Sequence, residues 1–112
     1  YDAIQLRFSP GGWEVRNNLA DNSIRSRNGV QFTNIGNVLN ATPDMFVEPS
    51  TGDLHLKESA IAAIDLGELL DSALTDADGD QRGGSSDIGA DEYVNVLNVV
   101  SPPSSPSNII VR

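Results

Sequence analysis

Short β-prone runs separated by polar turns fill the first half of the chain. They are AIQLRF, WEVRNN, NSIRS, VQFTN, NVLN, MFVE and DLHL. Several of them alternate, as Ile4, Leu6 and Phe8 do against polar neighbours. A period of two places every second side chain on the same face, which is typical of a strand with one buried side. The pattern predicts an all-β fold.

The turns between these runs leave two architectures open. Asn28-Gly29, just before VQFTN, has the composition of a type I′ hairpin turn between antiparallel strands. Asn17-Asn18 and Asn37, however, lie about one coil apart for a solenoid repeat of roughly 20 residues. In a solenoid, stacked amides pass hydrogen bonds from coil to coil. Ordinary surface turns use the same residue types, so periodicity alone does not decide between these interpretations.

The composition changes near Ser59. The run SAIAAIDLGELLDSAL is rich in Ala and Leu and predicts one or two helical turns, with Gly67 as a helix-ending residue. TDADGDQRGGSSDIGADEY, here called the acidic loop (Thr75 to Tyr93), follows it and leads into the β-prone run YVNVLNVV. Three prolines and four serines between Ser101 and Ser107 predict an extended linker. The final NIIVR is a candidate start of a further module.

Four short motifs follow one another between Gly52 and Tyr93: GDLHL, AIDLG, DADGDQR and DIGADEY. In this order they resemble the C-terminal signature of secreted bacterial right-handed parallel β-helix proteins. Many of these are choice-of-anchor proteins, and the pectate-lyase-like polysaccharide lyases share the fold. Four ordered blocks are far more specific than any single one. The chain departs from the family pattern where Ser-Pro usually precedes Ala-Ile-Asp, because Ile61-Ala62 stands there with one extra residue after Lys57.

The resemblance implies the terminal coils of a right-handed parallel β-helix, followed by a short helical or loop cap. Residues 1–58 would form terminal coils and residues 59–100 a C-terminal capping region with the DxDGD and DIGADEY motifs, leaving 101–112 as the linker. A solenoid end exposes strand edges and an apolar cross-section, which Ala60 to Leu70 have the apolar content to cover. We expect another chain, or an upstream part of a longer parent, to cover the Tyr1 end.

Charge and composition narrow the range of partners. The 112 residues carry a formal net charge of −9, which argues against nucleic acid and anionic membrane surfaces. No apolar run approaches the ~20 residues that a membrane-spanning helix requires, so membrane insertion is not expected. The chain contains no cysteine, which excludes disulfides and thiolate metal sites within it.

The acidic loop contains a candidate calcium site. Asp76, Asp78 and Asp80 alternate along the chain, and Asp87 stands where an EF-hand-like loop places its last carboxylate. Two features favour an arginine-organised turn instead. The glycine of the loop comes two positions too early, and Arg82 offers a rigid fork of donors to the carboxylates.

No catalytic residue is expected within this chain. Asp91 and Glu92 are sequence neighbours, and neighbours on a strand point to opposite faces. The resemblance implies that a lyase would use basic residues on central coils, whereas Lys57 is the only lysine here. His55 lies between two leucines, and the alternation predicts that it faces solvent in a structural role.

Trp13 and Arg16 are the candidate carbohydrate contacts. An aromatic face packs well on a sugar ring, although a core role for Trp13 is the alternative. The resemblance thus implies a structural C-terminal part of an extracellular or cell-surface β-helix protein that interacts with carbohydrate or a cell surface, with polysaccharide as the candidate partner. One alternative is the end of a polysaccharide lyase whose active site lies upstream, and another is a calcium-binding module. The sequence does not identify the substrate.

Overall fold

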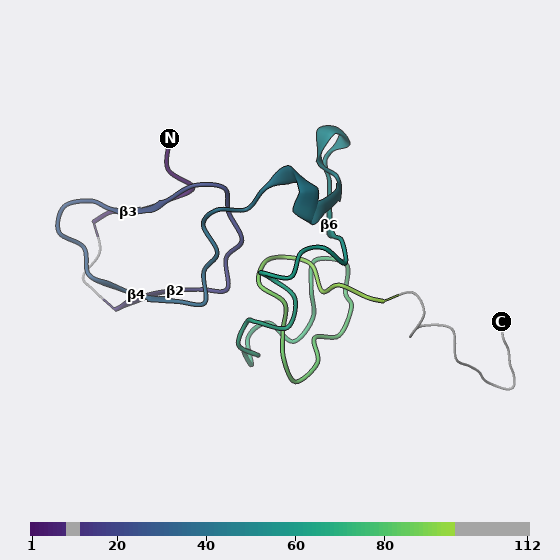
Figure 1. The fold of residues 1–112 in the computed structure, drawn as a ribbon. Helices are drawn as coiled ribbons and strands as arrows, with labels where there is room; N and C mark the ends of the chain where they lie inside the picture. Colours follow the sequence, from purple (N-terminus) through teal and green to yellow (C-terminus); the bar gives the residue numbers. More distant parts are fainter. Residues whose placement is uncertain (9–11, 96–112) are drawn as a thin grey trace, which may run out of the picture.

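The computed structural model describes residues 1–8 and 12–95, and these residues form a broadly all-β structure (Figure 1). Its strands are β1 (Ile4–Leu6), β2 (Trp13–Arg16), β3 (Ile24–Ser26), β4 (Phe32–Ile35), β5 (Phe46–Glu48) and β6 (Asp53–Leu56). Two short 3₁₀ turns, η1 (Pro43–Met45) and η2 (Pro49–Thr51), flank β5. Each strand lies in one of the predicted β-prone runs, except that β4 extends one residue beyond VQFTN to Ile35. The predicted linker at 101–112 and most of the YVNVLNVV run lie outside the described residues.

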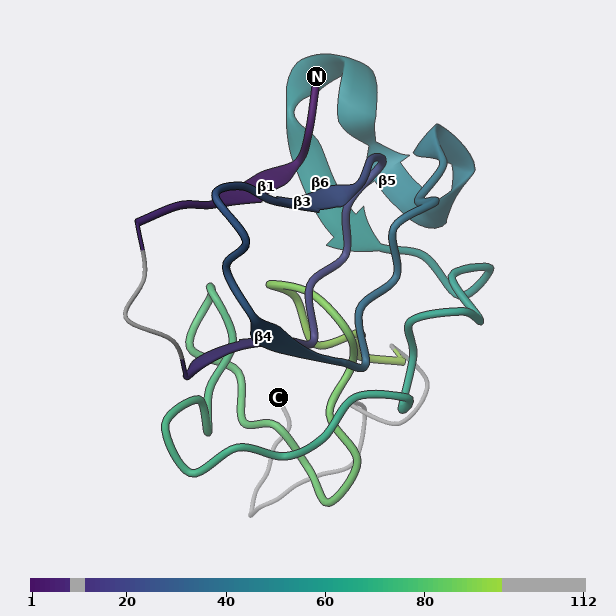
Figure 2. The ribbon, with the colours of Figure 1, turned by 90° about the vertical axis from the view of Figure 1, so that its left-hand side faces the viewer.

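The first four strands pair in parallel, two by two. β1 pairs with β3, so that Ile4 lies opposite Ile24, and β2 pairs with β4. An isolated parallel bridge between Leu19 and Val38 extends the second pair. Every partner lies 19 or 20 residues further along the chain. Figure 2 shows the result, with β1 and β3 together on one side of the looped chain and β4 on the other.

Amide hydrogen bonds link the two layers of chain. Asn18 donates from Nδ2 and from its backbone N–H to Oδ1 of Asn37, both at 2.9 Å. Asn37 in turn donates from Nδ2 to the carbonyl oxygen of Val15 at 2.7 Å. The amide stacking predicted from the asparagine spacing is therefore present.

Of the two alternatives that the turns left open, the hairpin at Asn28-Gly29 is not formed. Both residues have positive φ, 58° and 69°, as a type I′ turn requires. The strands on either side of the turn do not pair with each other, however, because β3 pairs with β1 and β4 pairs with β2. The turn forms a corner of the looped chain.

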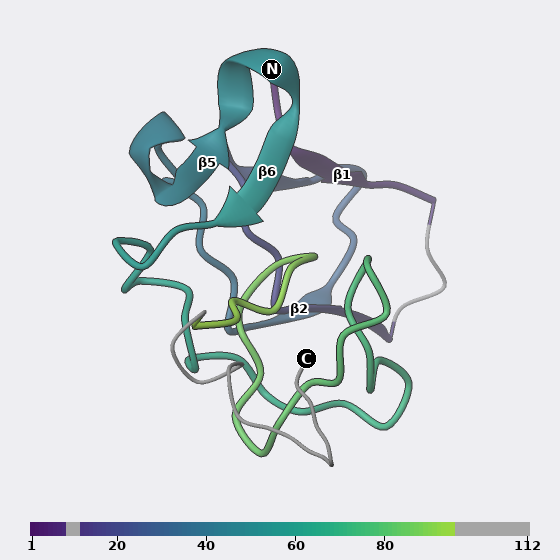
Figure 3. The same ribbon diagram turned by 90° about the vertical axis from the view of Figure 1, so that its right-hand side faces the viewer.

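The parallel pairing gives way to an antiparallel hairpin further along the chain. In this hairpin Phe46 of β5 lies opposite Leu56 of β6. The connection runs through η2 and Gly52, which adopts a left-handed conformation with φ 89°. Figure 3 shows the hairpin beside the acidic loop.

Buried apolar side chains form two separate clusters. The first lies among the N-terminal strands and consists of Leu6, Val15 and Val30. The second lies where the hairpin meets the C-terminal loops (residues 59–95) and consists of Met45, Leu56, Ala60, Ala63 and Ile88. Leu19 and Val38 pack against the second cluster, so the parallel strands contribute to both.

The helical turns predicted after Ser59 are mostly irregular turns. A single α-helical hydrogen bond joins the N–H of Ile64 to the carbonyl oxygen of Ala60. Asp65 has φ 60°, and this left-handed conformation interrupts any continuing helix. Gly67 does not end a helix either, because its N–H donates to the carbonyl oxygen of Ser86 at 2.8 Å. Among residues 1–8 and 12–95 no α-helix is formed.

Replacing Asn37 tests the amide link between the layers. We expect Asn37→Ala to lower the free energy of unfolding by about 1–3 kcal/mol, because it leaves partly buried groups of Asn18 and Val15 unpaired. Urea denaturation measures the loss. Asn40→Ala, at an exposed position nearby, is the control and should change stability little. Equal stability of the two variants would contradict the structural role of the amide link.

Candidate functional site

Arg82 occupies the centre of the acidic loop. Its Nη1 donates to the carbonyl oxygen of Asp87 at 3.1 Å and to Oε1 of Glu92 at 3.2 Å, and its Nη2 donates to the carbonyl oxygen of Gly89 at 2.9 Å. The side chains of Arg82 and Glu92 are only 9% and 11% exposed. The arginine-organised turn is thus present, but the fork binds Glu92 and two carbonyl groups rather than aspartate carboxylates.

Asp87 holds two distant segments together. Its side chain is almost fully buried, and its oxygens accept hydrogen bonds from the backbone N–H groups of Asp65 and Tyr93. This carboxylate therefore substitutes for backbone acceptors inside the fold, which is a structural use of the charge.

Asp76 has a similar structural role at the start of the loop. Oδ1 accepts hydrogen bonds from the N–H groups of Asp78 and Asp80, and Oδ2 accepts one from that of Glu92, all at 2.8–2.9 Å. Burial alone would raise the pKa of this carboxyl. The three N–H donors and the charge of Arg82 outweigh burial and hold the pKa of Asp76 below its ordinary value.

The four predicted calcium ligands divide into two groups. Potential ligand atoms of Asp76, Asp78 and Asp80 lie within 4.8 Å of one another, as the alternating spacing predicts. Asp87 instead falls in a separate group with Asp65 and Glu92. The structure thus assembles three of the four ligands, and one of these three already accepts three backbone hydrogen bonds.

His55 on β6 takes part in a cluster that sequence reasoning missed. As predicted, the ring is largely exposed, with 55% of the side chain accessible. Nδ1 lies 2.6 Å from Oδ1 of Asp53, and Nε2 lies 2.6 Å from Oδ2 of Asp78. Hydrogen bonds to Asp53 and then Asp78, with the charges of Asp78 and Asp91, raise the pKa of His55 to about 9. Asp53 lies two positions before His55 and therefore on the same face of the strand, and this spacing is the feature of the sequence that could have revealed the cluster.

Asp91 completes this cluster from the end of the acidic loop. Its Oδ2 accepts a hydrogen bond from the N–H of Leu56 at 2.7 Å. Burial is the largest influence and raises the pKa of Asp91, and the negative charges of Asp76 and Asp78 add to the effect. The N–H of Leu56 and the charge of His55 oppose it but do not cancel it.

An open cavity adjoins the cluster. Its volume is about 730 Å³, and its wall includes His55, Asp78, Asp80, Asp91 and Lys57. Carboxylates and an imidazole thus face a solvent-accessible hollow, where they are able to bind a cation or a polar ligand.

The predicted carbohydrate contacts, Trp13 and Arg16, do not converge. Both lie on β2 three positions apart, so alternation places them on opposite faces. Trp13 is 45% exposed. Arg16 is held by Glu14 and by Glu68, at 3.1 and 2.7 Å.

Comparison of the chain with protein-family models, with curated proteins and with solved structures finds no match in any of the three. No helix within residues 1–8 and 12–95 is long and apolar enough to cross a membrane.

Removing the charge of Arg82 tests the centre of the loop. We expect Arg82→Met to lower the free energy of unfolding by about 3–5 kcal/mol, because Glu92 is left buried without its partner. Thermal and urea denaturation report the loss. Arg27→Met, which removes an exposed arginine, is the matched control. The double variant Arg82→Met with Glu92→Met should recover part of the loss; an Arg82→Met protein as stable as the control would contradict the structure.

The protonated state of His55 stabilises the fold, which predicts a pH dependence. Because its folded pKa of about 9 exceeds the unfolded value near 6.5, this contribution is fully present below pH ~6.5 and is lost as the pH rises through ~9. We expect the Tm of the unmodified protein, measured without added metal ions, to fall over this range more than that of His55→Gln. Salt should shrink the difference, since the ring is half exposed. Parallel pH profiles for the two proteins would contradict this.

Proposed function

We propose that this chain forms the end of a right-handed parallel β-helix in an extracellular protein, and that its role is structural. Residues 1–58 would contain the last coils, and residues 59–95 of the capping region would close the end of the solenoid without catalytic residues of their own. The observation that carries the proposal is the repeated parallel pairing at a distance of 19 or 20 residues, together with the Asn18–Asn37 amide link. Parallel crossovers within one sheet are nearly always right-handed, which supports the proposed handedness.

Contacts at Asn17 support the closing role. This residue, in a left-handed corner, donates from Nδ2 to the carbonyl oxygen of Glu68 at 2.7 Å. Its own carbonyl oxygen accepts a hydrogen bond from the N–H of Gly89 at 2.8 Å. Two separate segments of the C-terminal loops are therefore hydrogen-bonded to the same corner of the parallel strands.

The order of the four motifs also fits an architectural role, because the motifs bind one another. The N–H of Ile88 in DIGADEY donates to the carbonyl oxygen of Ala63 in AIDLG at 2.8 Å. Similarly, the N–H of Ala77 in DADGDQR donates to the carbonyl oxygen of Ala90 at 2.9 Å. Buried carboxylates and Arg82 complete these links. The buried acidic residues of these motifs thus stabilise the region that would close the solenoid.

Exposed aromatic side chains support contact with a polysaccharide or with a covering chain. Tyr1 and Phe8 are 85% and 79% exposed, and Trp13 has an accessible ring. An exposed aromatic ring is able to pack against a sugar ring or against the apolar side chains of a partner. We assign carbohydrate contact to Trp13 alone, since Arg16 is already engaged by two glutamates. The alternative of a polysaccharide lyase would need catalytic residues beyond those described.

A substitution at Gly89 tests the closing role. Gly89 has φ 110°, and a Cβ there would lie 3.0 Å from Cβ of Leu19, so Gly89→Ala should loosen the C-terminal loops from the parallel strands. We expect faster hydrogen exchange in residues 59–95 and concentration-dependent self-association, because uncovered strand edges pair with other chains. Mass spectrometry and size-exclusion chromatography measure these effects.

Gly83→Ala is the control, because a Cβ at that position would meet open space. If Gly89→Ala loosened the loops and the protein still remained monomeric at every concentration, the loops would not be protecting the strand edges. The closing role would then be wrong.

A further inference from the structure

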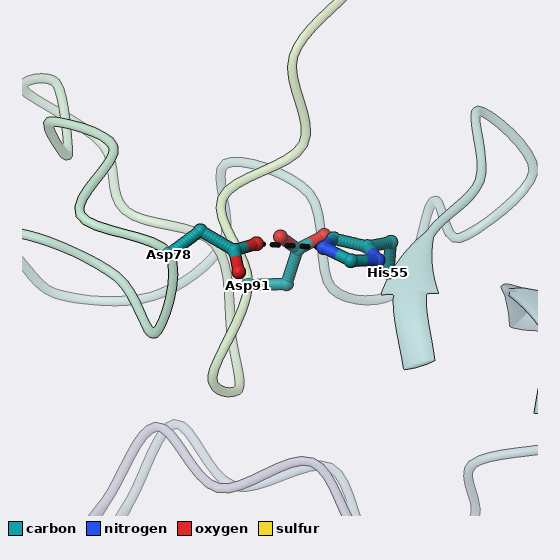
Figure 4. A group of neighbouring side chains, drawn as sticks. All are labelled: His55, Asp78 and Asp91. Carbon is teal, nitrogen blue, oxygen red and sulfur yellow. Dashed lines mark hydrogen bonds and ion pairs between the residues drawn. The ribbon is translucent and has the colours of Figure 1, made fainter. Parts of the chain in front are cut away.

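We propose that His55, Asp78 and Asp91 form a binding site for a divalent transition-metal ion, with Zn²⁺ as the ion of best fit (Figure 4). Asp78 and Asp91 come from motifs in which Asp76, Asp87 and Glu92 have structural roles. The site does not rest on the proposed closing function, since its three ligands are brought together by contacts within β6 and the acidic loop that exist whatever that region covers.

The geometry of the three side chains suits a small ion. One ligand atom from each residue lies within 4.8 Å of the other two. Figure 4 shows both carboxyl groups turned toward the imidazole. Metal bonds of ~2.0–2.2 Å in a tetrahedral site place ligand atoms about 3.3–3.6 Å apart. The 2.6 Å contact between His55 and Asp78 must therefore widen, which the half-exposed Asp78 side chain permits, and the ion must displace the proton on Nε2 into solvent.

The orientation of the imidazole distinguishes this site from a plain group of acids. Nδ1 of His55 contacts Asp53, and Nε2 points toward Asp78 and Asp91. A carboxylate on the far ring nitrogen is the usual outer-shell partner of a metal-binding histidine, because it selects the tautomer and holds the ring. Asp91 is also held in place, by the N–H of Leu56.

An ion at this position would be accessible and would keep a free coordination position. The cavity of about 730 Å³ opens on one part of the cluster. A second hollow of about 250 Å³ is lined by His55, Asp78 and Asp91 together with Asp53. Three protein ligands with an open fourth position are the arrangement in which zinc retains a water molecule or binds a ligand.

The ligand types favour a transition metal over calcium. An imidazole nitrogen suits Zn²⁺ and related ions, whereas Ca²⁺ takes six to eight oxygen ligands. The local charge favours a cation as well, because Asp53, Asp76 and Asp80 surround the three ligands in a chain of net charge −9.

Titration of the chelator-treated full chain with Zn²⁺, followed by calorimetry, tests the site. We expect one equivalent to bind, and Co²⁺ to bind at the same site with a visible absorption spectrum typical of nitrogen and oxygen ligands. His55→Gln should abolish stoichiometric binding. Asp53→Asn should weaken it about 10–100-fold, as loss of an outer-shell partner does. Asp71→Asn removes one exposed charge elsewhere and should leave binding unchanged.

Thermal denaturation of each metal-free variant shows whether it is folded, and Asp53→Asn provides a second variant should His55→Gln fail to fold. No saturable binding at one equivalent would overturn the proposal. Binding that survives intact in both folded variants would also overturn it, because the ion would then lie elsewhere. If Ca²⁺ at millimolar concentration displaced Zn²⁺ and bound with the same affinity, the ion would be assigned to the oxygen ligands of Asp76, Asp78 and Asp80, and the proposal would likewise be wrong.

Discussion

The C-terminal half of this structure depends on one buried guanidinium group. Asp87 and Glu92 are buried close together, and without a cation between their segments their charges would repel. Arg82 offsets the charge of Glu92 and binds the carbonyl oxygens of Asp87 and Gly89. Asp87 then remains free to accept backbone hydrogen bonds from other segments. A chain rich in acids is thereby able to place carboxylates inside its fold.

Asparagine side chains at one corner of the looped chain connect this half to the parallel strands. Among the described residues of the N-terminal strands only three apolar side chains are buried, so burial by itself supplies little of the cohesion there. Asn18 and Asn37 join the two layers, and Asn17 carries the hydrogen bonds to the C-terminal loops. Amides suit this position because one side chain both donates and accepts.

Local features of the fold could be predicted from the sequence, and long-range ones could not. The strand at Ile4 and Leu6 and the asparagine link could be predicted, because alternation and repeat spacing depend only on neighbouring or regularly spaced residues. The division of the calcium ligands was missed because Asp87 binds the N–H of Asp65, 22 residues earlier, which no count of loop positions reveals. The partnership of His55 with Asp78 spans 23 residues in the same way. Asn-Gly composition predicted the positive φ angles of the turn correctly but left the strand pairing open, because pairing is decided by the stacking of whole layers.

The separation of the two apolar clusters has a consequence for how the chain unfolds. Each cluster holds its own set of segments, and Leu19 and Val38, which form the isolated bridge between the parallel layers, pack against the larger cluster. Proteins open in cooperative units that follow such boundaries, with a different free energy for each unit. We therefore regard the chain as two foldons joined at one corner. The smaller cluster, among the parallel strands, would open first, while the acidic loop and the hairpin retain their native contacts.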